Sequence, residues 1–225
     1  MLQLRRDPPG ASLILAGAFL MDSDLAASER ELARRGLDAL QAVRGARGAQ
    51  CVVLVAGLGL GLTLRELLTL PGVGRVDVVE IFGPLVAWNR GPLAALNGRA
   101  LDDPRVSVRI EDLRAFLRAG AREPDAGGPA ARRYDLLLLD IDNGPTWLSL
   151  GENAWLYTAE GLEALRARAT PRGVIAFWAT EGSPAFEHVL AQATWAEWRR
   201  NEIRCPVGDG QRILEYVLYL LILRT

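Results

Sequence analysis

Acidic side chains follow one strongly apolar run in this sequence, in a pattern that suits proton transfer. The run YDLLLLDIDNG places Asp140 directly after consecutive leucines, Asp142 two positions later and Asn143 next to it. Ligands of open α/β sheets bind in the crevice beyond the carboxyl ends of the strands, where a carboxylate can accept a proton from a substrate. We therefore predict Asp140 and Asp142 as catalytic residues, and Asn143 and the nearby Trp147 as contacts to the substrate.

A glycine-rich turn marks a second place for chemistry, the binding of a nucleotide. The stretch AGLGLG carries Gly57, Gly59 and Gly61 between an apolar run and a helical pattern, with Leu60 inside the turn. Glycine lets the backbone pass close to a ligand, which the N-terminus of the following helix then faces. Leu62 occupies the position where a dinucleotide fingerprint has a small residue. By itself the turn is weak evidence, because glycines also serve in plain strand-to-helix connections.

Further acids stand where they would complete an adenosyl site. Glu80 ends the apolar run RVDVVEI, just before Ile81, and a carboxylate there can accept hydrogen bonds from ribose hydroxyls. Glu111 and Asp112 follow the next strand, where Asp112 can accept the adenine amino group or cap the following helix. The predicted cofactor-binding residues are Gly57, Gly59, Leu60, Gly61, Glu80, Ile81, Glu111 and Asp112.

Alternating strands and helices must position these residues. Apolar runs predict buried parallel strands at 51–56, 75–81, 105–110, 134–140 and 173–178. Helical patterns lie between them near 62–69, 84–96, 112–119 and 158–169. The repetition predicts a doubly wound α/β fold, in which ligands bind at the carboxyl ends of the strands. Glu181, after the fifth strand, is expected to face the same crevice and to bind substrate. Ser28 and Glu31 form a capping box that would begin an earlier helix.

The two ends of the chain depart from this alternation. From about Trp195 onward the sequence predicts two strands joined by a loop at 208–210. This antiparallel hairpin would close a mostly parallel seven-stranded sheet, which is typical of the Rossmann-like class I methyltransferase fold. The segment SLILAGAFLMD predicts a short N-terminal β-hairpin turning at Gly17. We therefore divide the chain into an N-terminal hairpin segment, 1–27, and a nucleoside-binding domain, 28–225.

Composition argues against several other classes of protein. A net charge of −1, spread along the chain, does not suit a nucleic-acid partner, which a basic face would bind. Cys51, Cys205 and the single histidine, His188, give neither metal-ligand spacing nor a Ser-His-Asp triad. The cysteine usage fits a reducing cytoplasm. No run reaches the roughly 18 apolar residues of a membrane span. We expect a cytoplasmic protein without a metal, a membrane or a nucleic-acid partner.

Taken together, the motifs resemble the spermidine synthase-like proteins of the class I methyltransferase superfamily. The resemblance runs from about Ser28 to the C-terminus, through VLVAGLGLGLTLREL, RVDVVEI, DDPRVSVRIEDLRAFL, YDLLLLDIDNGP and LYTAEGLEALRARATPRGVIAF. It implies a transferase that alkylates an amine-type acceptor from decarboxylated S-adenosylmethionine or S-adenosylmethionine. It further implies that Glu80 binds ribose, that Asp112 contacts adenine and that Asp140 helps to deprotonate the attacking amine. A homodimer is expected by the same analogy.

The acceptor side departs from the pattern of that family. Leu60 stands where the family's glycine loop has an Asp that holds the donor's aminopropyl ammonium. Asn143 stands where the family has a second acid, and the adjacent Asp142 could substitute for that acid. Arg35-Gly36 and Ala26 stand where the family has a Tyr-His pair and a Gln. Burying an ammonium group without a carboxylate partner costs several kcal/mol. A loop that lacks this carboxylate also no longer repels a donor that bears a carboxylate, such as S-adenosylmethionine. We therefore expect a reaction other than ordinary spermidine synthesis.

Other functions stay open from the sequence. One is methyl transfer from S-adenosylmethionine to a small molecule, and another is a non-catalytic relative that keeps only the nucleoside site. A NAD-linked dehydrogenase is disfavoured by Leu62 and by the C-terminal hairpin. A nucleic-acid methyltransferase is disfavoured because no N/D-P-P-Y/F motif follows the fourth strand.

Overall fold

The elements follow the predicted alternation in chain order. The computed structural model describes residues 2–7, 10–15, 17–23, 27–45, 50–122, 132–207 and 212–225. Its strands are β1 (Leu2–Asp7), β2 (Gly10–Leu15), β3 (Ala18–Asp22), β4 (Cys51–Ala56), β5 (Val73–Glu80), β6 (Val106–Ile110), β7 (Tyr134–Leu139), β8 (Ala169–Ala179), β9 (Ala196–Val207) and β10 (Arg212–Leu223). Its α-helices are α1 (Ala27–Arg44), α2 (Leu62–Thr69), α3 (Gly83–Arg90), α4 (Leu113–Arg122), α5 (Ala159–Ala167) and α6 (Pro184–Gln192). Short 3₁₀ helices span Ala100–Asp102 and Gly151–Tyr157.

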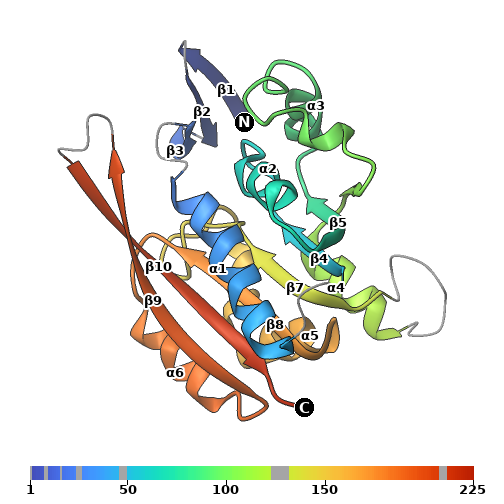
Figure 1. Ribbon diagram of the computed structural model, residues 1–225. Coiled ribbons are helices and arrows are strands. Elements are labelled where there is room, and N and C mark those ends of the chain that lie inside the picture. The colour runs from blue at the N-terminus through green and yellow to red at the C-terminus, as the bar shows by residue number, and fades with distance from the viewer. Residues whose placement is uncertain are drawn as a thin grey trace.

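A seven-stranded sheet in the order β6-β5-β4-β7-β8-β10-β9 forms the centre of the molecule (Figure 1). Neighbours from β6 to β8 pair in parallel, whereas β10 pairs antiparallel with both β8 and β9. The predicted mostly parallel sheet with a C-terminal hairpin is therefore confirmed, while the predicted turn at 208–210 lies outside the described residues. Strands at the centre of such a sheet are apolar on both faces because helices cover both.

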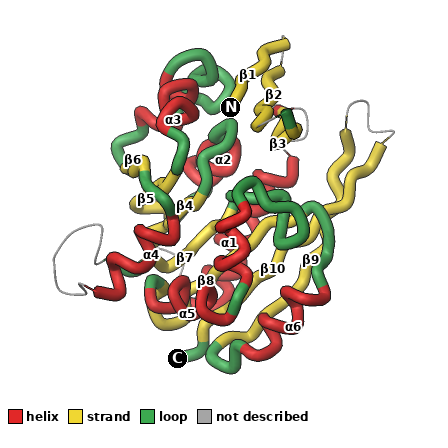
Figure 2. Tube along the Cα trace, turned by 180° about the vertical axis from the view of Figure 1, so that it is seen from behind, coloured by secondary structure: helices red, strands yellow, loops and turns green. Residues whose placement is uncertain are grey.

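Helices cover the two faces of this sheet and build two cores. On one face, α1 and α2 contribute Leu32, Leu40 and Leu64 to a cluster with β4 and β7. On the other face lie α4, α5 and α6 (Figure 2). Their side chains, Phe116 and Phe186 among them, pack in a second cluster with residues of the sheet. Among the described residues, no helix is long and apolar enough to cross a membrane.

The N-terminal segment is a three-stranded antiparallel sheet in the order β1-β2-β3. The predicted hairpin is present, since β2 and β3 pair on either side of Gly17. An additional strand, β1, pairs along β2 from Leu2 with Leu15 to Asp7 with Gly10. The alternation LQLRRD is too short and too polar to predict a strand by itself, and β2 supplies the hydrogen bonds that make it one.

The predicted capping box is wrong. Helix α1 begins at Ala27, so Ser28 lies inside its first turn and cannot be the N-cap. The Ser28 hydroxyl donates to the carboxylate of Glu29 at 2.8 Å. The carboxylate of Glu31 pairs with Arg35 at 2.8 Å. The sequence matches the capping motif, but the helix begins one residue before Ser28, and Glu29 lies on its buried face.

Candidate active site

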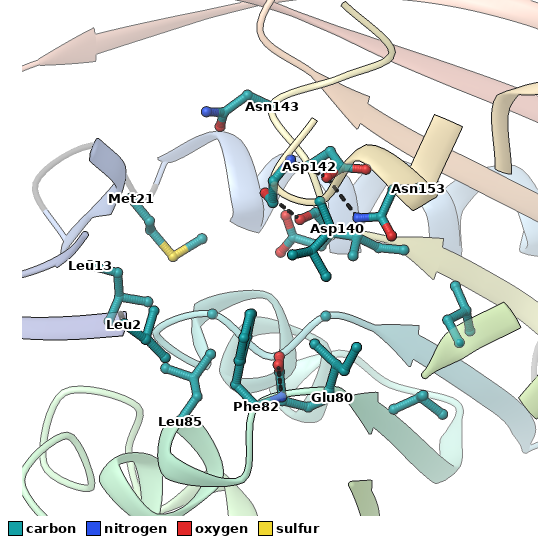
Figure 3. Close-up of a pocket in the computed structure, with 18 of the residues that line it drawn as sticks. Leu2, Leu13, Met21, Glu80, Phe82, Leu85, Asp140, Asp142, Asn143 and Asn153 are labelled. Carbon is teal, nitrogen blue, oxygen red and sulfur yellow. Dashed lines mark hydrogen bonds between the residues drawn. The ribbon is translucent and has the colours of Figure 1, made fainter. Parts of the chain in front are cut away.

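A cleft opens at the carboxyl ends of the central parallel strands, with the N-terminal sheet on one side (Figure 3). It encloses about 960 Å³, counting its open mouth. Its acidic part is formed by Glu29, Glu80, Glu111, Asp112, Asp140 and Asp142. Its apolar end is formed by Leu2, Leu13, Met21, Phe82 and Leu85.

The glycine turn lets the ends of β4 and β7 approach each other closely. Gly57 has φ +89°, and a Cβ on it would lie 2.1 Å from the carbonyl oxygen of Asp140. A Cβ on Gly59 would lie 2.8 Å from Sδ of Met21, which also accepts the Leu60 N–H at 3.2 Å. The turn is therefore pressed between β7 and the N-terminal sheet, and both glycines line the cleft.

Glu80 lies on the floor of the cleft beside the glycine turn. Its carboxylate accepts the N–H groups of Leu58 at 2.9 Å and Phe82 at 2.8 Å, so it fixes the ends of both neighbouring segments. Burial raises the pKa of Glu80, while these backbone bonds oppose the rise. A carboxylate has about four lone-pair sites, so two remain for the hydroxyls of a ribose.

The end of β6 supplies the next wall of the cleft. Asp112 accepts the N–H of Arg114 at 2.7 Å and pairs with its guanidinium at 2.9 Å, which lowers the pKa of Asp112. Asp112 thus caps α4, which is one of its two predicted roles, and it also lines the cleft. Ile81 and Glu111 line the cleft as well, and 40% of Ile81 is exposed as an apolar surface suited to a base.

Of the two predicted catalytic residues, Asp140 and Asp142, Asp140 accepts fewer hydrogen bonds. It accepts one hydrogen bond in the described part of the chain, from the hydroxyl of Thr63 at 2.6 Å. Burial, and secondarily the charge of Glu80, raises the pKa of Asp140 to about 6, although the Thr63 bond opposes this. A half-buried carboxylate with a raised pKa at the floor of a cleft is suited to accept a proton.

Asp142 is held differently, two residues further on. Its carboxylate accepts the Ser149 N–H at 2.7 Å, the Asn153 side-chain amide at 2.9 Å and the Tyr157 hydroxyl at 3.3 Å. These bonds tie the loop after β7 to the 3₁₀ helix Gly151–Tyr157. Asp142 lines the cleft, but most of its hydrogen-bonding capacity serves to shape that wall.

The structure does not bring all the predicted residues to the cleft. Asn143 lines it. Leu60 is fully buried in an apolar cluster with Leu13 and other leucines, and Gly61 is the N-cap of α2; neither lines the cleft. Trp147 is 56% exposed and Glu181 is also exposed, and both lie outside the cleft's lining.

Glu29 is a residue of the cleft that sequence reasoning missed. Its side chain is 5% exposed, lines the cleft, and has a pKa raised to about 7 by burial and then by the charge of Asp140. The available signal was the spacing of Glu29 with Leu32, Ala33 and Gly36, which places an acid on the buried face of α1.

The helix positions that the resemblance assigned to the acceptor lie elsewhere. Arg35 pairs with Glu31 outside the cleft, and a Cβ on Gly36 would lie 2.7 Å from a methyl group of Leu138. Ala26 lies outside the described residues. In the described part of the chain, no three His, Cys, Asp or Glu side chains are grouped so that they could hold a metal ion.

Comparisons with known proteins agree on one family. A family model described as the spermine/spermidine synthase domain matches residues 45–206. Polyamine aminopropyltransferase 2 of Pseudomonas aeruginosa is 36% identical over 135 residues, which are 58% of this chain and 34% of that protein. The polyamine aminopropyltransferase of Mycobacterium tuberculosis is 39% identical over 133 residues, 59% of this chain and 23% of that protein. This chain therefore spans about a third or less of the length of these curated relatives.

Solved structures share the fold. Spermidine synthase from Thermotoga maritima superposes with a TM-score of 0.72 at 18% identity, covering 98% of this chain and 68% of that one. A spermidine synthase in complex with the transition state analogue AdoDATO gives a TM-score of 0.70 at 16% identity over the same shares.

Proposed function

Since the chain belongs to the spermine/spermidine synthase family, we propose that it is a transferase that moves an aminopropyl group from decarboxylated S-adenosylmethionine to an amine. The observation that carries the proposal is the position of Asp140, half-buried at the end of β7 beside the glycine turn and Glu80. The matched relatives are named polyamine aminopropyltransferases, which favours aminopropyl over methyl transfer.

In this proposal, each part of the cleft has a task. Glu80 binds the ribose, and Ile81 with Asp112 borders the adenine. The amine nitrogen attacks the carbon next to the sulfonium, so that a C–N bond forms while the C–S bond breaks. The electron pair of the broken bond stays on sulfur, which leaves methylthioadenosine, and Asp140 accepts the proton from nitrogen. Most of the rate enhancement then comes from holding the two reactants in line.

Leu60 no longer supports methyl transfer. Its side chain is fully buried in a cluster with Leu13 and Leu85 and does not line the cleft. The argument for methyl transfer requires the side chain at position 60 to lie beside the amino-acid part of the donor. Only then would the absence of a carboxylate there allow S-adenosylmethionine to bind. The position of Asp140, with its raised pKa, also supports catalysis over a purely nucleoside-binding role.

The apolar end of the cleft supports an acceptor other than an ordinary diamine. Leu2, Leu13, Met21 and Leu85 lie together there, away from Asp140 (Figure 3). Burying a second ammonium against such a wall is costly, whereas an alkyl chain gains from burial. We include in the proposal that the end of the acceptor remote from the reacting amine is uncharged.

The test is a transfer assay on the purified chain. It is incubated with decarboxylated S-adenosylmethionine and either n-butylamine or 1,4-diaminobutane, and in parallel with S-adenosylmethionine. We expect aminopropylated butylamine and methylthioadenosine by mass spectrometry. S-adenosylhomocysteine as the sole nucleoside product would instead identify a methyltransferase. Product from the diamine alone would contradict the proposed acceptor, and no product with any pair would contradict the transferase.

A further inference from the structure

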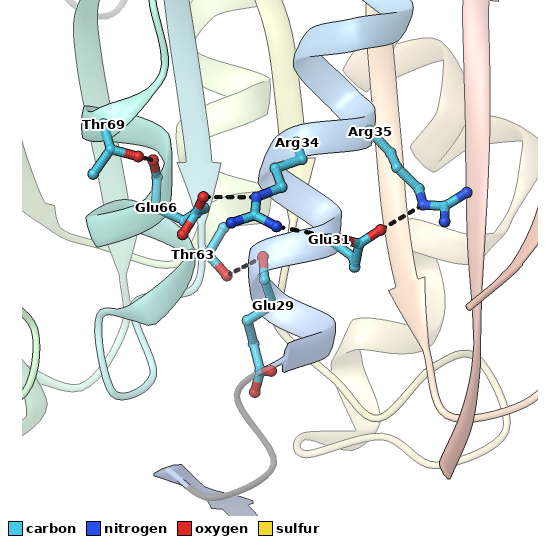
Figure 4. Close-up of polar contacts among 7 residues, drawn as sticks. All are labelled: Glu29, Glu31, Arg34, Arg35, Thr63, Glu66 and Thr69. Carbon is cyan, nitrogen blue, oxygen red and sulfur yellow. Dashed lines mark hydrogen bonds and ion pairs between the residues drawn. The ribbon is translucent and has the colours of Figure 1, made fainter. Parts of the chain in front are cut away.

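Helix α1 brings a further buried carboxylate, that of Glu29, to the amine side of the cleft. Figure 4 shows the Glu29 side chain pointing away from the outward ion pairs of Arg34 and Arg35. The hydroxyl of Thr63 lies 3.4 Å from the main-chain oxygen of Glu29 and 2.6 Å from the carboxylate of Asp140. One side chain of α2 thus joins the start of α1 to the end of β7.

The surroundings of Glu29 leave its charge weakly compensated. The Ser28 hydroxyl donates to it at 2.8 Å, and the neighbouring Arg30 is exposed. The other titratable groups that face it are Asp140 at the end of β7, Tyr216 on β10 and Cys205 on β9. Burial and Asp140 together raise the pKa of Glu29. Near neutral pH the two carboxyl groups therefore hold about one proton between them.

A second observation on the same wall points to a ligand. Trp178, 9% exposed, lines the cleft, and its indole N–H has no hydrogen-bond partner among the described residues. Its ring packs on Tyr216, with ring centroids 5.4 Å apart. A buried donor without an acceptor is uncommon in folded proteins. The group that accepts this N–H has to carry a lone pair, as a water molecule or a neutral amine does and an ammonium does not, whereas the face of the indole ring attracts positive charge.

We propose that Glu29 is a second catalytic carboxylate, which with Asp140 binds the acceptor's ammonium group and takes up the proton that the amine loses. The proposal rests on the proposed aminopropyl transfer. When the ammonium binds, the pair releases the proton that it shares, because the cation now compensates the second negative charge. As the C–N bond forms and the electron pair of the C–S bond moves to sulfur, one proton passes from nitrogen back to the pair. The atoms and charges balance without a further reactant.

The kinetic test compares Glu29→Gln with Glu31→Gln, which changes an outward acid on the same helix. The pair loses its last proton from Glu29, whose pKa is raised to about 7, whereas the pKa of Asp140 is about 6, so replacing Glu29 shifts the acidic limb of the kcat/KM profile to lower pH. We expect this shift together with a fall in kcat of roughly a hundredfold. Glu31→Gln should leave the limb in place and kcat nearly unchanged. An unmoved limb in Glu29→Gln would overturn the proposal, because a merely structural role lowers activity without moving the profile.

A binding measurement separates this inference from the proposed reaction. Calorimetric titration of n-butylamine into the protein saturated with methylthioadenosine, in two buffers of different ionisation enthalpy, counts the protons released. We expect the wild-type protein to release a proton and Glu29→Gln to release markedly less. Proton release without transfer would contradict the reaction while supporting Glu29 as part of an amine site. Equal release by both proteins, or no binding of the amine to the wild type, would overturn the role of Glu29.

Discussion

At the scale of single residues, the four central carboxylates of the cleft differ in how fully they are hydrogen-bonded. Glu80 accepts two backbone N–H groups and Asp142 accepts three donors, so both position neighbouring segments. Asp140 and Glu29 each accept one hydroxyl. Hydrogen bonds to the charged form lower a pKa and burial raises it. The two least satisfied carboxylates are therefore the ones suited to exchange protons.

Thr63→Val should raise the pKa of Asp140, because the hydroxyl that stabilises its charged form is lost. The acidic limb of the transfer rate is expected to move to higher pH, opposite to the shift expected for Glu29→Gln. The affinity for methylthioadenosine, measured by calorimetry, should change little. If the limb stayed in place, Asp140 would not be the group that titrates in the reaction.

Glu29→Gln should stabilise the protein at alkaline pH. The pKa of Glu29 in the folded protein, about 7, lies above its ordinary value of 4.5. The stability that this carboxyl contributes is thus complete below 4.5 and is lost as the pH rises through about 7. We expect urea unfolding at about pH 8 to favour the variant by no more than about 3 kcal/mol, and at about pH 4.5 to show little difference. A gain that is equal at both pH values would contradict the raised pKa.

At the scale of elements, the site depends on how closely the ends of β4 and β7 approach. Gly57→Ala would place a methyl group 2.1 Å from a backbone oxygen, at a φ that side chains disfavour. We expect a loss of roughly 2 kcal/mol or more in stability and loss of methylthioadenosine binding. Gly151→Ala is the matched control, because a Cβ there meets nothing within 4 Å. Equal effects of the two changes on binding would argue against a role for the close approach.

The N-terminal sheet contributes the apolar end of the cleft through Leu2, Leu13 and Met21. Met21→Glu would place a carboxylate above Gly59, within reach of a second ammonium. We expect a gain in kcat/KM for 1,4-diaminobutane relative to n-butylamine of roughly tenfold. Met21→Gln, of similar size but neutral, should leave the ratio near that of the wild type. An unchanged ratio in Met21→Glu would place the acceptor's remote end elsewhere.

At the scale of the whole molecule, the cleft joins parts that are distant in the chain: the N-terminal sheet, the start of α1 and the ends of β4 to β7. A nucleoside that binds across several of these parts stabilises the folded chain as a unit, because it binds only the folded state. Methylthioadenosine at about a hundred times its Kd should add about 2.7 kcal/mol and raise Tm by roughly 5–10 °C. Guanosine serves as the control in a thermal scan, and an equal rise with it would contradict a specific adenosyl site.

Much of the fold, and several residues of the cleft, could be predicted from local patterns. The strand Cys51–Ala56 and the helix Leu62–Thr69 match their predicted ranges, because a continuous apolar run and a helical period identify buried elements without further information. Glu80, Asp112 and Asp140 were expected together because parallel strands place their carboxyl ends at one edge of the sheet. The structure places all three in the lining of the cleft.

The sequence by itself thus determined the class of fold, the strands and the acids at their ends, since these depend on periodicity and on residue type. Only the tertiary structure decided which way individual side chains face. The rotation of α1 against the sheet brings Glu29 into the cleft, and the N-terminal sheet buries Leu60 away from it. Loop packing leaves Trp147 and Glu181 outside. These outcomes depend on contacts between segments far apart in the chain, which no local pattern records.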